Sequence, residues 1–227
     1  MARLFIVGTP IGNLGDITFR AVETLKSVGL VAAEDTRQTL KLLSHLGIRK
    51  PLVSCRSGNE EAAAGRIIAA LDSGEDAAYC SDAGTPGISD PGSRLGKAVL
   101  DKGHQLVPIP GPSALASLIS VAARGEKTII FEGFLSTKAG KRKTRLAELM
   151  ALDAAIIIYE SPFRILKLLA DIAEIDSERY VCIGREMTKL HEEFVRGSVE
   201  SVLQTFSERD SIKGEFSVYV GAGLTKN

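Results

Sequence analysis

The sequence has no tryptophan, three cysteines, three histidines and no net charge. Cys55, Cys80 and Cys182 stand far apart and form no CxxC pair, which argues against a disulfide framework or a zinc site. The histidines are equally scattered, so we expect no metal centre. The 28 basic and 28 acidic side chains provide no basic field over the whole protein. Any contact with nucleic acid must therefore come from a local patch.

Long hydrophobic runs are also absent near the start of the chain. Within the first ten residues only 4–7 are continuously apolar, which is too short for a signal peptide or a membrane span. We therefore expect a cytoplasmic protein with no membrane association. What remains is the composition of an ordinary globular protein, with 44% hydrophobic residues and a length of 227 residues that suits one large or two small domains.

Short apolar runs alternate with amphipathic segments, which is typical of a layered α/β architecture. Asp16 is expected to cap the first helix, and Leu40, Leu43 and Leu46 to form the apolar face of the second. We expect two α/β domains, residues 1–117 with a mainly parallel sheet and residues 118–227 with a more mixed one, and a linker near 123–127. Strands are predicted at 4–7, 30–33, 77–80, 105–108, 128–131, 154–159, 180–183 and 215–220, and later helices at 142–151, 163–174 and 198–207.

The most informative segment is the loop at residues 81–94, SDAGTPGISDPGSR. Its glycines and prolines exclude helix and sheet, yet they can define a rigid path. It follows a predicted strand, and the carboxyl ends of strands are where open α/β sheets bind ligands. A long surface connection is the alternative interpretation.

Two further small-residue loops, 8–13 and 110–114, also follow predicted strands. In a parallel sheet these three loops share one edge and converge. The first meets neither the GxGxxG pattern nor the P-loop pattern. With Asp82 and Ser113 as the obvious polar side chains, the loops predict a ligand held largely by backbone contacts rather than a metal or a phosphate.

Charged groups gather at three places in the second half of the chain. Segments 159–162 and 185–193 place ionisable groups at the ends of strands, where surface ion pairing is the alternative to function. The third place is residues 138–145, which contain five basic side chains and no acidic one. Such a cluster predicts either the solvated start of a helix or a contact with phosphates. Its members are Lys138, Lys141, Arg142, Lys143 and Arg145.

Taken together, these segments resemble the ribosomal RNA small-subunit methyltransferase I family, of the tetrapyrrole-methylase-like class of S-adenosylmethionine enzymes. The matching motifs cover nearly the whole chain in order. They are TPIGNL (9–14), AEDTR (33–37), SDAGTPGISDPG (81–92), PGPSA (110–114), FEGFL (131–135), YESP (159–162), REMTKLHEE (185–193) and GEF (214–216). The chain departs from the family pattern at 54–58, around 122–126 and at Ser136.

The resemblance implies two α/β domains with S-adenosylmethionine in the cleft between them, and a homodimer. It implies 2′-O-methylation of a decoding-centre cytidine in small-subunit (16S) ribosomal RNA, presented as free RNA or as the 30S particle. The residues that it assigns to the cofactor are Pro10, Asp82, Gly84, Ile88, Ser113, Ala114, Tyr159 and Gly214.

The same reaction needs a proton acceptor and cationic side chains for the RNA. Asp35, Glu160 and Glu186 are the candidates for a general base, with water as the alternative. Arg37, Lys189 and the basic run at 138–145 are expected to contact RNA phosphates, which positions the RNA without reading its sequence. Two other functions stay open: a tetrapyrrole methyltransferase of the same fold, and a non-catalytic RNA-binding assembly protein.

Overall fold

The computed structural model describes residues 2–56, 58–88 and 92–223. The chain divides into two compact units, an N-terminal unit of residues 1–113 and a C-terminal unit of residues 114–227. The division lies just before helix α5 (Ala114–Val121), not near residues 123–127, and four residues before the domain boundary expected after residue 117. Leu118 of α5 contacts Gly184 of the C-terminal unit, which explains why this helix belongs to the second unit.

The N-terminal unit is built on a parallel sheet in the order β3-β2-β4-β1-β5. Strand β4 is buried along its whole length, as expected for a strand covered on both faces. The third strand was missing from the sequence prediction because it has only three residues and too short an apolar run. The strands are β1 (Arg3–Val7), β2 (Leu30–Ala33), β3 (Leu52–Ser54), β4 (Ala77–Cys80) and β5 (Gln105–Ile109).

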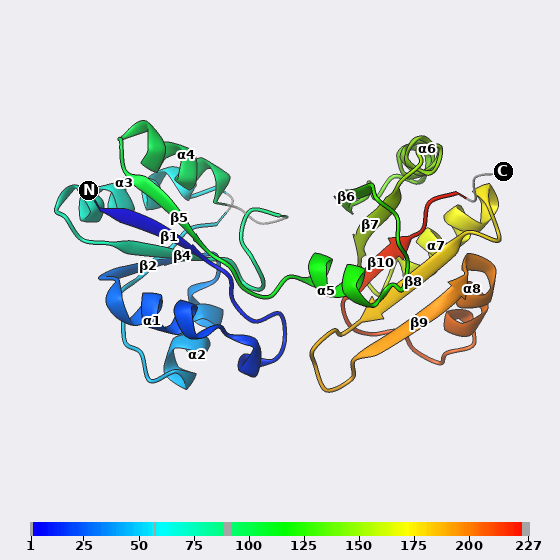
Figure 1. Cartoon of the computed structure of the whole chain (residues 1–227), viewed down its shortest axis with the longest axis horizontal. Coiled ribbons are helices and arrows are strands. Elements are labelled where there is room, and N and C mark those ends of the chain that lie inside the picture. The colour runs from blue at the N-terminus through cyan, green and yellow to red at the C-terminus, as the bar shows by residue number, and fades with distance from the viewer. Residues whose placement is uncertain (1, 57, 89–91, 224–227) are drawn as a thin grey trace. The chain divides into compact units, whose positions relative to one another are not determined.

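Four helices cover the two faces of this sheet (Figure 1). Helices α1 (Phe19–Ser27) and α2 (Thr36–His45) pack on one face, and α3 (Glu60–Asp72) and α4 (Ser93–Asp101) on the other, so two apolar clusters sandwich the sheet.

Two expectations about these helices were wrong. Asp16 ends a separate short 3-10 helix, η1 (Leu14–Asp16), and the hydroxyl of Thr18 caps α1 by accepting from the amide of Ala21 at 3.1 Å. Leu40 is 54% exposed, because the neighbouring Leu42 and Leu43 occupy the buried face of α2.

The C-terminal unit contains a mixed sheet in the order β6-β7-β10-β8-β9. Strands β6 and β7 are parallel, and the remaining pairings are antiparallel. Strand β9 was not predicted, because this edge strand is only partly buried and lacks a clear apolar alternation. The strands are β6 (Ile129–Phe134), β7 (Ala155–Glu160), β8 (Tyr180–Arg185), β9 (Glu193–Ser198) and β10 (Phe216–Val220).

Helices α6 (Ala139–Met150), α7 (Ile165–Ile175) and α8 (Val199–Ser207) form one core with the sheet. Alternate residues of β7, Ile156 and Ile158, belong to this core, as the period of two in a strand requires. No helix in the described ranges is long and apolar enough to span a membrane.

Candidate functional site

Three loops meet at the carboxyl edge of the N-terminal sheet, as the sequence predicted. Strands β4, β1 and β5 are neighbours in the sheet, so the loops that follow them are neighbours too. The amide of Thr9 donates to the carbonyl of Gly84 at 2.9 Å, and the amide of Gly84 donates back at 3.1 Å. The hydroxyl of Thr85 donates to the carbonyl of Pro112 at 3.0 Å. The long loop is therefore fastened to both of its neighbours.

Glycines allow these loops to approach at backbone distance. A Cβ atom built on Gly111 would lie 2.7 Å from the carbonyl oxygen of Gly8, and one on Gly8 would lie 2.8 Å from the Cα of Gly111. Gly84 has a φ of +79°, a conformation that favours glycine. This edge thus presents main-chain groups and small side chains, which fits a ligand bound through the backbone.

Acidic groups link the ends of β2 and β4 beside the loops. The carboxylate of Asp82 accepts from the amide of Asp35 at 2.7 Å, and that of Glu34 accepts from the amide of Asp82 at 3.2 Å. Hydrogen bonds from the side chain and then the amide of Arg37 lower the pKa of Asp35 to about 2. Asp35 also caps α2, so it is a weak proton acceptor with a structural task.

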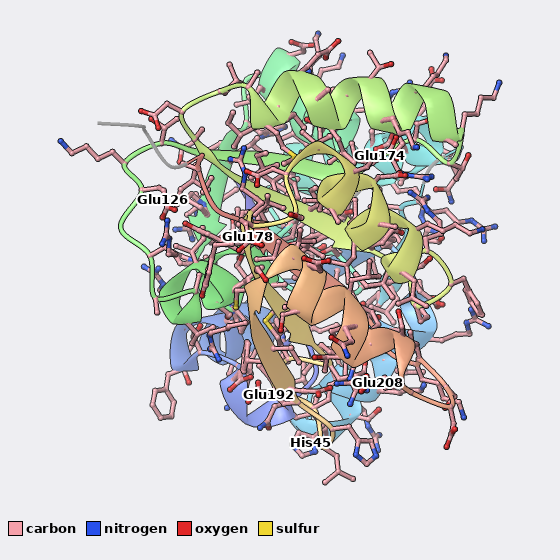
Figure 2. All side chains as sticks on the ribbon, turned by 90° about the vertical axis from the view of Figure 1, so that its right-hand side faces the viewer. His45, Glu126, Glu174, Glu178, Glu192 and Glu208 are labelled. Carbon is pink, nitrogen blue, oxygen red and sulfur yellow. The ribbon has the colours of Figure 1, made fainter. Side chains whose placement is uncertain are left out.

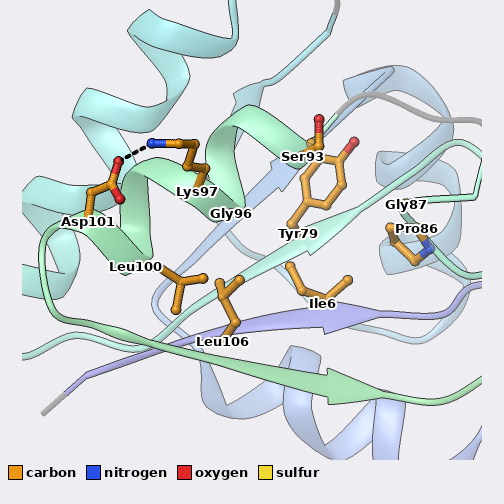
Figure 3. A pocket seen from close by; sticks show the side chains of 11 residues that line it. Ile6, Tyr79, Pro86, Gly87, Ser93, Gly96, Lys97, Leu100, Asp101 and Leu106 are labelled. Atoms are coloured by element: carbon orange, nitrogen blue, oxygen red, sulfur yellow. Dashed lines mark hydrogen bonds and ion pairs between the residues drawn. The ribbon is translucent and has the colours of Figure 1, made fainter.

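Two hollows flank the loops within the N-terminal unit. One, of about 240 Å³, lies between Pro10, Asp82 and the first turns of α2. The other, of about 400 Å³, lies between α4 and the sheet and is lined by Ile6, Tyr79 and Leu106, with the Lys97–Asp101 ion pair near one end (Figure 3). The loop borders this second hollow at Pro86 and Gly87.

Part of the expected site lies outside the described residues. Residues 89–91 of the long loop and Ser57 of the atypical segment 54–58 are the positions left out. Ile88 is described and is half-buried. The far end of the loop is nevertheless anchored, because the amide of Gly92 donates to the buried carboxylate of Glu60 at 2.8 Å. Sequence reasoning missed Glu60 as an anchor, since nothing local in the sequence pairs residues 32 positions apart.

Tyr159 and Glu160 end strand β7 in the C-terminal unit but have different surroundings. The ring of Tyr159 meets the rings of Phe131 and Phe134 edge-on, with centroids 5.0 and 5.9 Å apart. Glu160 is 2% exposed, accepts from the amide of Ser161 at 2.7 Å and forms an ion pair with Arg164 at 2.9 Å. Glu160 therefore helps to hold the turn after β7, and its expected role as a proton acceptor stays a prediction.

Glu186 and Gly214 lie against each other. Glu186 accepts from the amide of Glu215 at 2.8 Å and from Lys189 at 2.9 Å, and a Cβ atom on Gly214 would lie 2.4 Å from its Cγ. Burial by itself would raise the pKa of Glu186, but these two hydrogen bonds lower it. Lys189 also pairs with Glu215 at 2.9 Å, so its charge is already shared between two carboxylates.

The basic run divides into structural and exposed members. Arg142 is 6% exposed and pairs with the buried carboxylate of Asp171 at 2.6 Å, so its charge already has a partner inside the C-terminal unit, and the phosphate contact expected of it stays a prediction. Lys143 pairs with Glu174, which Figure 2 shows beside α6. Arg145 pairs with Glu132 at 2.8 Å and with a further glutamate of α6, and its side chain remains half exposed.

Lys138 and Lys141 differ from the other exposed members of the run, Lys143 and Arg145, which are both paired with acidic side chains. Lys138 and Lys141 lie at the start of α6, and neither forms an ion pair with any described residue. In the N-terminal unit Arg37 is also exposed, but it pairs with Asp35 at 2.6 Å. Lys138 and Lys141 are therefore the cations of the predicted set that are most open to a polyanion.

Comparison with known proteins decides the family. The family model for Tetrapyrrole (Corrin/Porphyrin) Methylases matches residues 3–203. Ribosomal RNA small subunit methyltransferase I of Borrelia garinii subsp. bavariensis is 45% identical over 96% of this chain and 97% of its own length. The chain belongs to this methyltransferase family. The relative of the same name from Thermotoga maritima is also 45% identical, over 96% and 97%, and that from Bacillus subtilis is 43% identical, over 97% and 75%.

Solved structures support the fold of the family. Cobalt precorrin-4 methyltransferase has a TM-score of 0.70 at 15% identity and covers 96% of this chain and 94% of its own. Uroporphyrin III C-methyl transferase from Thermus thermophilus has a TM-score of 0.67 at 15% identity, covering 96% and 97%. The predicted tetrapyrrole-methylase-like α/β fold is confirmed.

The family membership also confirms the predicted cofactor, S-adenosylmethionine. At the loop edge of the N-terminal unit the loops meet at backbone distance, because a Cβ atom at Gly8 or Gly111 would collide with the neighbouring backbone. Main-chain groups and small side chains at this edge are suited to a ligand held by few placed polar groups.

Proposed function

We propose that this chain methylates the ribose 2′-hydroxyl of a decoding-centre cytidine in small-subunit ribosomal RNA. The observation that carries the proposal is the 45% identity with ribosomal RNA small subunit methyltransferase I of Borrelia garinii subsp. bavariensis along nearly the whole of both chains. The choice of nucleotide and atom comes from the family motifs. Because the proposed substrate belongs to the small ribosomal subunit, we propose that the reaction takes place in the cytoplasm and that the enzyme acts as a homodimer.

Residues of both units are proposed to hold the cofactor. In the N-terminal unit the fastened loops supply the contacts, supported by the hydrogen bonds between Thr9 and Gly84 and between Thr85 and Pro112. The proposed residues there are Pro10, Asp82, Gly84, Ile88 and Ser113, and those of the C-terminal unit are Ala114, Tyr159 and Gly214.

The bound cofactor supplies a methyl group that is already activated on a positively charged sulfur, so the protein contributes mainly binding and orientation. Holding two reacting groups in near-attack geometry is worth roughly 7–11 kcal/mol. The rigid attachment of the loops suits this task, because a mobile site would lose part of that gain.

The contacts of the three candidate carboxylates favour structural roles for them over acceptance of the proton. Glu160 is buried in an ion pair, Asp35 has a pKa of about 2, and Glu186 is held by Lys189. We propose that solvent accepts this proton and that the three carboxylates organise the loops around them.

A ribose-methylation experiment tests the proposal. Small subunits from cells that lack this protein are incubated with the purified chain and S-adenosylmethionine labelled in the methyl group, and 2′-O-methylation is mapped along the ribosomal RNA. We expect one new modified cytidine in the decoding region. Label on a base instead of a ribose, or on a uroporphyrinogen-type substrate and never on RNA, would reject the proposal. Failure of the folded chain to bind S-adenosylmethionine in calorimetry would favour a non-catalytic assembly protein.

A further inference from the structure

Two large aromatic side chains are exposed at one edge of the C-terminal sheet. Phe134 ends β6 and is 63% exposed, and Phe163 lies in the turn after β7 and is 88% exposed. Strands β6 and β7 are parallel neighbours (Figure 1), so the end of β6, which carries Phe134, and the end of β7, three residues before Phe163, lie at the same end of the sheet. The guanidinium of Arg164 donates to the carbonyl of Leu135 at 2.8 Å, which joins the segments that carry the two rings.

A β-bulge directs Phe134 to this position. The register of β6 against β7 shifts between Phe131 and Gly133, and Gly133 has a φ of +70°. In a regular strand, residues three positions apart point to opposite faces. Here the extra residue brings both Phe131 and Phe134 against the ring of Tyr159. Bulges of this kind redirect side chains beside functional sites.

Two exposed lysines follow β6 closely in the chain and have no ion-pair partner among the described residues. Lys138 comes four residues after Phe134, and Lys141 follows in the first turn of α6. Neither forms an ion pair with any residue that the structure describes, whereas Arg142, Lys143 and Arg145 of the same run are all paired. An apolar protein partner would gain little from two solvated ammonium groups, but a polyanion with exposed flat rings matches both features.

We propose that Phe134 and Phe163 stack on unpaired bases of the substrate RNA while Lys138 and Lys141 contact the adjoining phosphates. The four residues are here called the aromatic–lysine edge. Aromatic rings bind single-stranded RNA because every base offers a flat face, and lysines add a contribution that depends on salt. This inference rests on the proposed function and adds to it the surface that holds the RNA.

The experiment compares exposed aromatic positions in the full-length protein. Phe163→Ala is the cleanest variant, because Phe163 has no ring partner among the described residues, whereas Phe134 touches Tyr159. Phe19→Ala is the matched control, since Phe19 is 95% exposed but lies at the start of α1 in the N-terminal unit. The dissociation constants for unmodified small-subunit ribosomal RNA and for S-adenosylmethionine are measured for each variant.

We expect Phe163→Ala to weaken RNA binding about 5- to 150-fold, the range for loss of one stacked base, with S-adenosylmethionine binding unchanged. Phe163→Tyr should restore RNA binding and Phe163→Leu should not, because stacking needs a flat ring. Lys138→Ala with Lys141→Ala should reduce the slope of log K against log salt by about 0.7 for each lost phosphate contact, and Phe163→Ala should leave the slope unchanged.

Three outcomes would overturn the inference. The first is an unchanged RNA affinity in Phe163→Ala, and the second is an equal loss of RNA affinity in Phe163→Ala and in the Phe19→Ala control. The third is a shift of Phe163→Ala to monomers in light scattering, which would make this edge a contact between copies. Ribose methylation by the wild-type chain is scored in parallel. A wild type that methylates while Phe163→Ala binds RNA normally rejects this inference alone, whereas a wild type that binds RNA without methylating it rejects the proposed function.

Discussion

Replacing Arg142 with alanine should destabilise the C-terminal unit rather than weaken RNA binding directly. The guanidinium and the carboxylate of Asp171 are 7% and 9% exposed and lie 2.6 Å apart, so the substitution leaves a buried negative charge. Removing one partner of a buried ion pair costs about 3–5 kcal/mol. Lys143 lies 3.8 Å from the same carboxylate and supplies partial compensation, so we expect a value near the lower limit, about 3 kcal/mol.

Thermal unfolding followed by circular dichroism measures this loss. For a unit of 114 residues, a change of about 3 kcal/mol corresponds to a fall in melting temperature of roughly 10–20 °C. Lys141→Ala is the neighbouring control and should leave the melting temperature within about 2 °C, because surface substitutions usually change stability by less than 0.5 kcal/mol. The double variant Arg142→Met with Asp171→Leu should recover most of the stability, since apolar replacements of buried pairs are often neutral. A loss below about 1 kcal/mol in Arg142→Ala, with RNA binding abolished, would refute the structural role.

Three further outcomes are expected. Gly111→Ala should weaken S-adenosylmethionine binding at least about tenfold, because the new Cβ atom would lie 2.7 Å from the carbonyl oxygen of Gly8 and push the two loops apart. An unchanged affinity in calorimetry would contradict this. Asp35→Asn should retain methylation within a few-fold, since asparagine also caps helices, and a loss of activity beyond a hundredfold would restore Asp35 as the base. Hydrogen bonds from Arg209, and then from Arg185, lower the pKa of Glu193 to about 2. The contribution of Glu193 to the stability of the folded chain is therefore fully present above its unfolded pKa near 4.5 and is lost as the pH falls towards 2. Glu193→Gln should flatten the acid limb of the stability curve, and an unaltered limb would show that other carboxylates control it.

The sequence was sufficient to predict that three loops meet at the carboxyl edge of the N-terminal sheet. Three small-residue loops after three strands must converge if the strands are parallel, and the bonds of Thr9 and Thr85 show that they do. The short strands β3 and β9 escaped prediction because one is three residues long and the other is partly exposed at an edge. In both cases the pairing with a neighbouring strand, not the local pattern, defines the element.

Charged residues were predicted less well than loops. Arg142 and Lys141 are adjacent and chemically similar in the sequence, yet one is buried against Asp171 and the other is exposed. For Glu160, too, the sequence did not predict burial. Its partner Arg164 lies only four residues later, but the burial of Glu160 depends on the packing of the whole sheet. Whether a charge is available to a ligand depends on desolvation and on the partner that packs against it.

The sequence alone determined the family, the α/β class and the converging backbone loops, because glycine, proline and apolar periodicity act locally and parallel strands share their ends. Only the tertiary structure decided which charges are already satisfied and which rings are exposed. Arg142 is neutralised by a residue 29 positions away, and a bulge against β7 brings the partly exposed ring of Phe134 to the ring of Tyr159. Both results depend on contacts between distant segments, and the free energy of a charge or a ring follows from those contacts rather than from its neighbours in the chain.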